Sequence, residues 1–232
     1  DWGVAQMARK LGKHADYQFF SERSKNYQNL FHPELKFMVP RDSKGDWLED
    51  FSEFSGFGFT EGNSWQYSFY VPHDVPGLID LTGRELFNQR LKDGFEKSIK
   101  HNFAAHAFDN SSGQVAEYYI NHGNQPNMQA AFLFNYSGKP WLTQKYSRMI
   151  MDQFYGAHPY KGWEGDEDEG QMGAWFVMSS LGFFEMDGGL TEVPLLTLTS
   201  PLFEKATIHL DQNYYKGKTF EIIAINNSTT ND

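Results

Sequence analysis

The fold is decided by residues 165–184, which read GDEDEGQMGAWFVMSSLGFF. Four consecutive carboxylates lie between two glycines, and an apolar, aromatic run follows them directly. In that run Met172, Trp175, Phe176 and Leu181 recur at helical spacing. The sequence after Gln171 is therefore predicted to form a helix that ends at Gly182, with Trp175 largely buried.

The four adjacent carboxylates repel one another, so the fold must gain something by holding them together. One interpretation is structural: they cap the helix N-terminus, where carboxylates accept hydrogen bonds from unpaired backbone N–H groups and favour the helix dipole. The other is functional: carboxylate and amide oxygens at the rim of a pocket bind sugar hydroxyls or a hard cation such as calcium. The two interpretations are compatible.

Composition narrows the function classes. The 232 residues suffice for one ordinary domain or two small ones, and the 17 % aromatic content suits a packed interior or a carbohydrate pocket. A net charge of −10 argues against a nucleic-acid partner, which needs a basic surface. The chain has no Cys, which excludes disulfides and thiolate metal sites. It also lacks an apolar run long enough to span a membrane.

Periodicity predicts a mainly α-helical chain. Two helices are expected in residues 2–30, the first with an apolar stripe, and further helices at 78–81, 84–100, after Gly123 and at 141–155. Residues 32–64 are expected to be loop-rich. The residues of the first stripe are Val4, Met7, Ala8 and Leu11.

The C-terminal part of the chain has a different pattern. Short strands are predicted at 195–198, 206–210 and 220–225, with a hairpin turn at 213–218. Antiparallel helix pairs joined by long loops, followed by a β segment, are what an α/α toroid needs, with a pocket lined by its loops. We therefore expect residues 1–188 to be helices and loops of such a toroid and residues 189–232 to be a separate antiparallel β segment. Since the chain begins at Asp1 and ends just after a strand pattern, we expect it to be a piece of a longer protein.

Three polar segments are candidates for a site, each with a structural alternative. Glu61-Gly62-Asn63-Ser64-Trp65-Gln66-Tyr67 offers polar groups and stacking faces, or a capped helix start with core aromatics. His73 lies in a turn, where it either serves chemistry or pairs with Asp74 as a structural cap. The segment 123–129 has four amide side chains that either line a pocket wall or cap a helix whose first residues include Pro126.

Taken in order, these segments resemble glycoside hydrolase family 92, the calcium-dependent exo-α-mannosidases. The resemblance is carried by 165–184 and by Pro72-His73-Asp74, Gly123-Asn124-Gln125-Pro126, Asn135-Tyr136-Ser137-Gly138-Lys139-Pro140-Trp141 and Ser200-Pro201-Leu202-Phe203-Glu204-Lys205-Ala206-Thr207-Ile208. It implies the later part of an (α/α)6 catalytic domain that packs on an N-terminal β-sandwich outside this chain. It also implies an inverting hydrolase of mannose-containing glycans in which calcium binds the sugar, secreted or periplasmic in the full-length protein.

Two departures from the family pattern matter. Family members carry Glu, the general acid, where this chain has Gln125, and an amide cannot donate a proton as a carboxylic acid does. The family's catalytic base lies beyond the last residue of this chain, so the isolated chain is expected to be inactive. Asp166 and Glu169 replace the commoner Asn and Cys of the family.

Gln125 favours a mannosyl-phosphate substrate of the mannose-1-phospho-6-mannose type. A phosphate monoester leaves readily as an anion, so its departure needs no acid, and Gln125 avoids repelling its charge. A branch of the family that hydrolyses such linkages looks similar at this position. Two alternatives stay open: an ordinary exo-α-1,2/1,3/1,4-mannosidase with a displaced acid, and a non-catalytic helical-repeat binding module.

The resemblance also assigns the remaining site residues. Gln125 is placed on the leaving-group side of the pocket. Two weaker assignments to the pocket wall or the calcium shell are Asn124 and Gln171. The residues assigned to substrate binding are Glu167, Asp168, Asp166, Glu61, Trp65 and His73.

Overall fold

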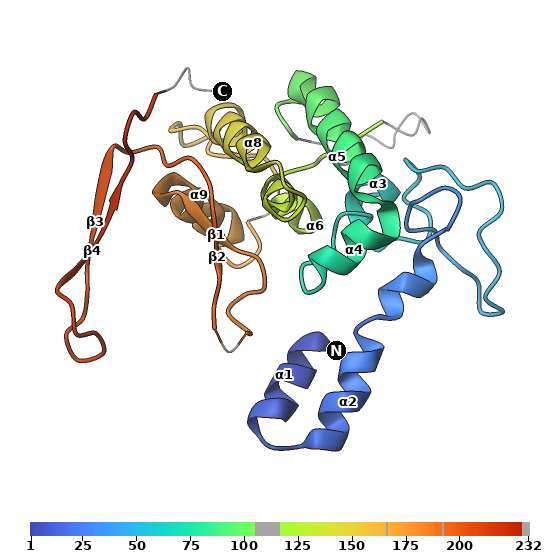
Figure 1. The fold of residues 1–232 in the computed structure, drawn as a ribbon. Helices are drawn as coiled ribbons and strands as arrows, with labels where there is room; N and C mark the ends of the chain where they lie inside the picture. Colours follow the sequence, from blue (N-terminus) through green and yellow to red (C-terminus); the bar gives the residue numbers. More distant parts are fainter. Residues whose placement is uncertain (105–116, 166, 192, 229–232) are drawn as a thin grey trace.

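The computed structural model describes residues 1–104, 117–165, 167–191 and 193–228. It is mainly helical, as the sequence predicts, and its strands form two small antiparallel sheets (Figure 1). No helix in these ranges is long and apolar enough to cross a membrane. The helices are α1 (Trp2–Lys10), α2 (His14–Arg23), α3 (Ser64–Tyr67), α4 (Val75–Thr82), α5 (Arg84–Ser98), α6 (Gln125–Met128), α7 (Leu133–Tyr136), α8 (Pro140–Gln153) and α9 (Gln171–Leu181). Short 3-10 helices are η1 (Asn26–Leu30), η2 (Ile99–His101) and η4 (Ala130–Phe132).

Helix α9 confirms the prediction made from residues 165–184. It runs from Gln171 to Leu181, and Gly182 ends it in the left-handed conformation with φ 96°. Trp175 is only 2 % exposed. The capping interpretation is confirmed for Glu167, whose Oε1 accepts a hydrogen bond from the Gly173 N–H at 3.2 Å.

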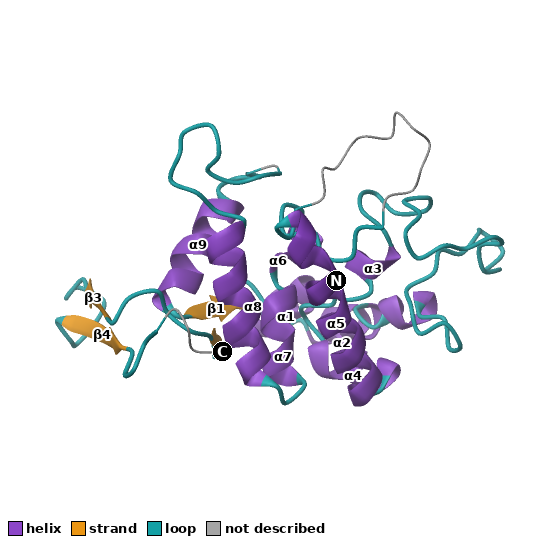
Figure 2. Cartoon of the chain, turned by 90° about the horizontal axis from the view of Figure 1, so that it is seen from above, coloured by secondary structure: helices purple, strands orange, loops and turns teal. Residues whose placement is uncertain are grey.

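Aromatic side chains connect the helices of the core. The ring of Phe95 on α5 stacks on Tyr146 of α8 with a centroid distance of 4.4 Å. Phe132 stacks on Phe184 at 4.2 Å, which joins η4 to the strand after α9. In Figure 2, α8 lies between α9 on its left and α7, and α5 and α4 lie to the right of α7. Part of the high aromatic content therefore serves the packed interior.

Helices α1 and α2 form a hairpin that extends from one end of the body (Figure 1). Most of the apolar stripe of α1 faces solvent, unlike the apolar faces of the core helices. Val4, Met7 and Leu11 are 49 %, 62 % and 62 % exposed. Only Ala5 and Ala8 of α1 are buried. Two short helices cover only a narrow strip of each other, so most of this stripe has no partner within the described residues.

The segment after Gly123 is not one continuous helix. It is divided into α6, η4 and α7, because the backbone bonds from Asn127 N–H to Asn124 O and from Phe132 N–H to Gln129 O span three residues rather than four. The Gln129 amide reinforces the division, since it donates to the carbonyl oxygens of Pro126 and Phe69.

One strand that the sequence did not indicate lies before the predicted β segment. Strand β1 (Phe183–Glu185) pairs antiparallel with β2 (Leu196–Leu198), so one sheet includes residues from both sides of position 188. Strands β3 (Lys205–His209) and β4 (Thr219–Ile223) form the predicted hairpin. The hairpin extends away from the helices in Figure 1. The division into two domains at residue 188 stays a prediction.

Candidate active site

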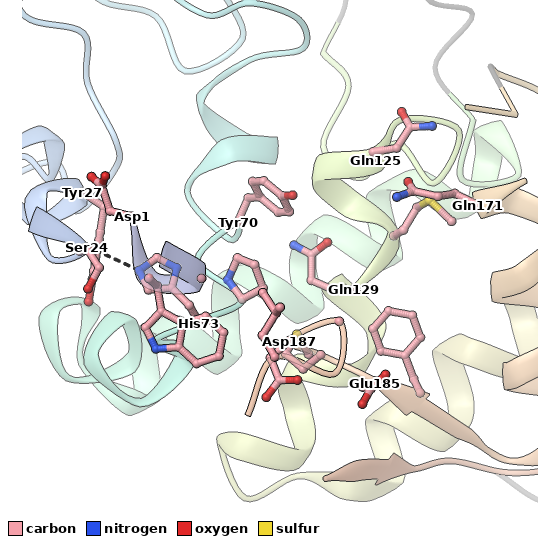
Figure 3. A pocket seen from close by; sticks show the side chains of 18 of the residues that line it. Asp1, Ser24, Tyr27, Tyr70, His73, Gln125, Gln129, Gln171, Glu185 and Asp187 are labelled. Carbon is pink, nitrogen blue, oxygen red and sulfur yellow. Dashed lines mark hydrogen bonds between the residues drawn. The ribbon is translucent and has the colours of Figure 1, made fainter. Parts of the chain in front are cut away.

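A cavity of about 950 Å³ opens between the α1–α2 hairpin and the body of the chain. Its size is within the range of small-molecule sites. Figure 3 shows Gln125, Gln129 and Gln171 on one side and Ser24, Tyr27 and His73 on the other. Trp2 and Tyr70 add aromatic surface to its lining, and sugar rings pack well against such faces.

Three residues predicted from the sequence meet in this cavity: His73, Gln125 and Gln171. Gln125 is the first residue of α6 and Gln171 the first residue of α9. His73 lies in the turn before α4. These residues are distant in sequence, so the packing of three separate helix starts brings them together.

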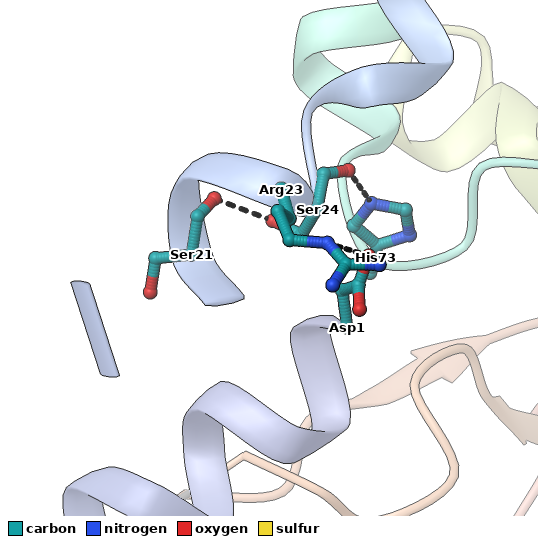
Figure 4. Close-up of polar contacts among 5 residues, drawn as sticks. All are labelled: Asp1, Ser21, Arg23, Ser24 and His73. Atoms are coloured by element: carbon teal, nitrogen blue, oxygen red, sulfur yellow. Dashed lines mark hydrogen bonds and ion pairs between the residues drawn. The ribbon is translucent and has the colours of Figure 1, made fainter. Parts of the chain in front are cut away.

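His73 is held by backbone contacts and not by Asp74. Its Nε2 donates to the Ser24 carbonyl oxygen at 2.9 Å (Figure 4). Asp74 instead caps α4 by accepting from the Gly77 N–H at 3.1 Å, and it accepts from the Tyr27 hydroxyl at 2.7 Å. The structural alternative thus holds for Asp74 as a helix cap, whereas the hydrogen bond described for the His73 ring goes to Ser24 and not to Asp74. Beside His73, Arg23 pairs with Asp1 at 3.4 Å.

Five other predicted residues, all of them described by the structure, do not line the cavity. Trp65 is 7 % exposed and packs edge-on against Phe37 and Tyr119, as the structural alternative requires. Glu167 caps α9, and Asp168 precedes the helix with φ 40°. Glu61 and Asn124 are also outside the lining. Asp166 lies outside the described residues. Their sugar-binding roles stay predictions.

The amide segment contributes to the cavity wall, but its capping alternative does not hold at Asn124, the N-cap residue of α6, whose side chain makes no capping hydrogen bond. Asn127 is buried; it accepts from the Asn121 N–H and donates to the Gln66 carbonyl oxygen, which ties α6 to α3. Gln125 and Gln129 face the cavity. Sequence reasoning missed two carboxylates that line the cavity, Glu185 at the end of β1 and Asp187 just after that strand. The signal for them was the Asp-Gly-Gly turn that ends the apolar run.

Calcium takes six to eight oxygen ligands. Among the described residues, no group of three or more His, Asp or Glu side chains is arranged to hold a metal ion. Gln171 offers one amide oxygen inside the cavity, whereas Asn124 does not reach it. Of the two residues predicted for the calcium shell, only Gln171 therefore lies in the cavity, and the calcium site stays a prediction.

Comparison with known proteins identifies the family. A model of the glycosyl hydrolase family 92 catalytic domain matches residues 1–232. The chain belongs to glycosyl hydrolase family 92. The resemblance found in the sequence is thus confirmed.

Solved structures of family 92 enzymes are similar to this chain. The α-mannosidase BT3965 from Bacteroides thetaiotaomicron is 38 % identical with a TM-score of 0.75, and the match covers 97 % of this chain and 27 % of that one. Its complex with mannoimidazole has a TM-score of 0.78, at 36 % identity, with 97 % of this chain and 29 % of that chain covered. The inverting mannosidase BT2199 from the same organism is 35 % identical with a TM-score of 0.75, over 98 % of this chain and 30 % of its own.

A curated relative from Arthroderma benhamiae is described as an uncharacterized secreted glycosidase. It is 27 % identical over 97 % of this chain and 29 % of its own length. The chain thus spans roughly three-tenths of the length of the family 92 proteins that it matches.

Proposed function

We propose that the whole protein carrying this chain is an inverting α-mannoside hydrolase that prefers mannosyl-phosphate linkages. The observation that carries the proposal is the meeting of Gln125, Gln171 and His73 in one cavity, in a chain 38 % identical to an α-mannosidase. Its substrates would be mannose-containing glycans, including N-glycans, or mannosyl phosphates. We also propose that the whole protein completes an (α/α)6 toroid, which packs on an N-terminal β-sandwich. The whole protein would be secreted.

The leaving-group preference follows from the chemistry of residue 125. Inverting glycosidases use one carboxylic acid to protonate the leaving oxygen and one carboxylate to activate water on the opposite face. A sugar alkoxide needs that proton, whereas a phosphate monoester, with a second pKa of about 6, leaves as an anion. The Gln125 amide can donate an N–H to a phosphate oxygen without adding a negative charge beside it. The catalytic base would come from outside this chain, so we expect the isolated chain to be inactive.

Calcium is proposed as the cofactor of the whole protein. It would polarise and orient the sugar hydroxyls when bound. From the described residues, the Gln171 amide oxygen is the donor that fits, because it faces the cavity and hard cations prefer oxygen ligands. Metal analysis of the whole protein tests this: Gln171→Ala should weaken calcium binding, and a calcium-free active enzyme would contradict it.

The test of the leaving-group proposal compares kcat/KM for a mannose-1-phosphate diester and a plain α-mannobioside. Gln125→Glu should raise activity on the mannobioside, because a positioned acid contributes about 10²–10⁴-fold when the leaving group needs a proton. It should lower activity on the diester, since an ionised carboxylate would face a negative substrate. Gln153→Glu on exposed α8 surface adds the same charge away from the cavity and should change neither. The proposal would be overturned if the wild type prefers the mannobioside and Gln125→Glu leaves the ratio of the two kcat/KM values unchanged.

An ordinary α-mannosidase with a displaced acid is the second candidate, and one observation favours it. Glu185 and Asp187 line the same cavity as Gln125. If one of them protonates the leaving oxygen, Glu185→Gln or Asp187→Asn should reduce hydrolysis of the mannobioside by about 10²-fold or more. Under the mannosyl-phosphate proposal, neither substitution removes an acid that the diester needs.

A further inference from the structure

His122 is a buried ionisable residue that the proposed chemistry does not use. It lies three residues before Gln125, its side chain is 0 % exposed, and it does not line the cavity. Its Nε2 is 2.9 Å from the Tyr155 hydroxyl oxygen. That hydroxyl is in turn 3.0 Å from the backbone carbonyl oxygen of Met172, the residue after Gln171.

The geometry fixes the direction of each hydrogen bond. A carbonyl oxygen only accepts, so the Tyr155 hydroxyl donates its hydrogen to Met172. The Tyr155 oxygen must then accept from His122, which places the imidazole hydrogen on Nε2. Nδ1 of His122 has no partner among the described residues, as expected for the bare nitrogen of this tautomer. Burial lowers the pKa of His122 to about 3, so the ring is neutral at neutral pH.

A second connection joins the same two elements. The Trp175 indole N–H on α9 donates to the carbonyl oxygen of Met128, the last residue of α6, at 2.8 Å. The Trp175 ring also meets the His122 ring edge-on with a centroid distance of 4.3 Å. Gln125 is therefore flanked on both sides by residues that are hydrogen-bonded, directly or through Tyr155, to the first turns of α9. Gln171 is the first residue of that helix.

We propose that His122 and Tyr155 are positioning residues that hold Gln125 beside Gln171 on one wall of the cavity. The inference rests on the proposed function, because it assigns the two glutamines to one wall that contacts the bound substrate. Both hydrogen bonds are made between buried or half-buried groups, where an unpaired partner is costly. A misplacement of about 1 Å at a reacting centre can cost about 10²-fold in rate.

The first test is Tyr155→Phe in the whole protein, with Tyr146→Phe as its matched control. Tyr146 also has a buried ring and a hydroxyl bond, to Glu96 Oε1 at 2.7 Å, but that bond joins α8 to α5. We expect Tyr155→Phe to lower kcat by about 10- to 100-fold with little change in KM. Tyr146→Phe should stay within about twofold although it also loses a hydroxyl hydrogen bond. Equal kinetic effects of the two variants would overturn the proposal.

The second test is rescue at His122. A glutamine side chain can present an amide N–H in place of the imidazole Nε2–H, whereas leucine cannot. His122→Gln should retain kcat within about fivefold of wild type, and His122→Leu should fall as far as Tyr155→Phe. Loss of the same size in both His122 variants would show that the ring fills space without orienting Gln125.

Two further measurements do not depend on activity. Nitrogen NMR of the wild-type histidine rings should show His122 as the Nε2–H tautomer, and an Nδ1–H tautomer would overturn the chain of hydrogen bonds. Crystal structures should show the starts of α6 and α9 displaced by about 0.5 Å or more in Tyr155→Phe. Unchanged positions in that variant would overturn the proposal. If the protein hydrolyses no mannoside, but the His122 tautomer and the displaced helix starts are both observed, then the proposed function fails. The hydrogen-bonded connection between α6 and α9 stands in that case. If hydrolysis is normal in Tyr155→Phe, the inference fails and the proposed function stands.

Discussion

Replacing Trp175 by alanine should produce one of the largest single losses of stability in this chain. Its side chain is 2 % exposed and contacts His122, Phe132 and Tyr155 through its ring. A buried aromatic side chain removes about 150–250 Å² from water, worth about 4–6 kcal/mol at 25 cal/mol per Å². Measured Trp→Ala changes in protein cores cost about 3–5 kcal/mol. The upper part of that range is expected here, because the Met128 carbonyl oxygen also loses its donor.

Urea unfolding followed by far-UV circular dichroism measures this cost without relying on indole fluorescence. Trp141→Ala on α8 is the matched control, since it makes the same substitution at a side chain that is 53 % exposed. The control should cost less than about 1 kcal/mol. Trp175→Phe should be intermediate, at about 1–3 kcal/mol, because it keeps an aromatic ring but loses the N–H. If Trp175→Ala costs no more than Trp141→Ala, the burial and bridging assigned to Trp175 are wrong.

Three further predictions concern a cap, a glycine and pH. Asp74→Ala should lower the free energy of unfolding by about 1–3 kcal/mol, with partial recovery in Asp74→Asn, because the carboxylate caps α4 and accepts from Tyr27. Gly182→Ala should cost more than Gly188→Ala in thermal unfolding: both have positive φ, but an added Cβ meets Pro201 at 3.1 Å only at position 182. Stability should fall as pH drops from about 6.5 toward 3, since the unfolded state then protonates His122 and the folded state does not. His122→Gln should reduce the slope of the free energy of unfolding against pH by up to about 1.4 kcal/mol per pH unit in this range. An unchanged slope would contradict the assignment of this pH dependence to His122.

The sequence predicted elements well where periodicity and end signals agreed. Helix α9 has an apolar period, a carboxylate cap from Glu167 and a glycine stop, and the structure has all three. The β3–β4 hairpin likewise has alternating strands around a turn. Strand β1 was missed because it is three residues long and continues the apolar run of α9 without a polar break. Its identity depends on pairing with β2, which local sequence does not encode.

The candidate site was less accessible to local reasoning. His73, Gln125 and Gln171 were identified through a family resemblance, and no periodicity places them together. Trp65 illustrates the limit, because an aromatic residue beside polar groups suits a sugar platform as well as a core. Packing against Phe37 and Tyr119 decides for the core, and those contacts come from distant parts of the chain.

The acidic run forms a tight backbone turn in front of α9, a role that its charge alone does not indicate. Asp168 and Glu169 have φ values of 40° and 64°, a conformation that costs non-glycine residues energy and persists only where surrounding contacts impose it. Two such contacts come from Glu167: its carbonyl oxygen accepts from the Gln171 N–H at 3.0 Å, and its carboxylate caps Gly173.

Gly165, at the other end of the acidic run, completes the arrangement. It lies so close to the Gly123 backbone that any Cβ at position 165 would collide with it. The turn is thereby held against the loop that leads into α6, and it delivers Gln171 to the cavity beside Gln125. The α6 and α9 starts are thus joined by the glycine contact, the His122–Tyr155 bonds and the Trp175 bond. Since these connections are separate, loss of one should shift the two glutamines without releasing them, so activity should fall in steps rather than vanish with the first substitution.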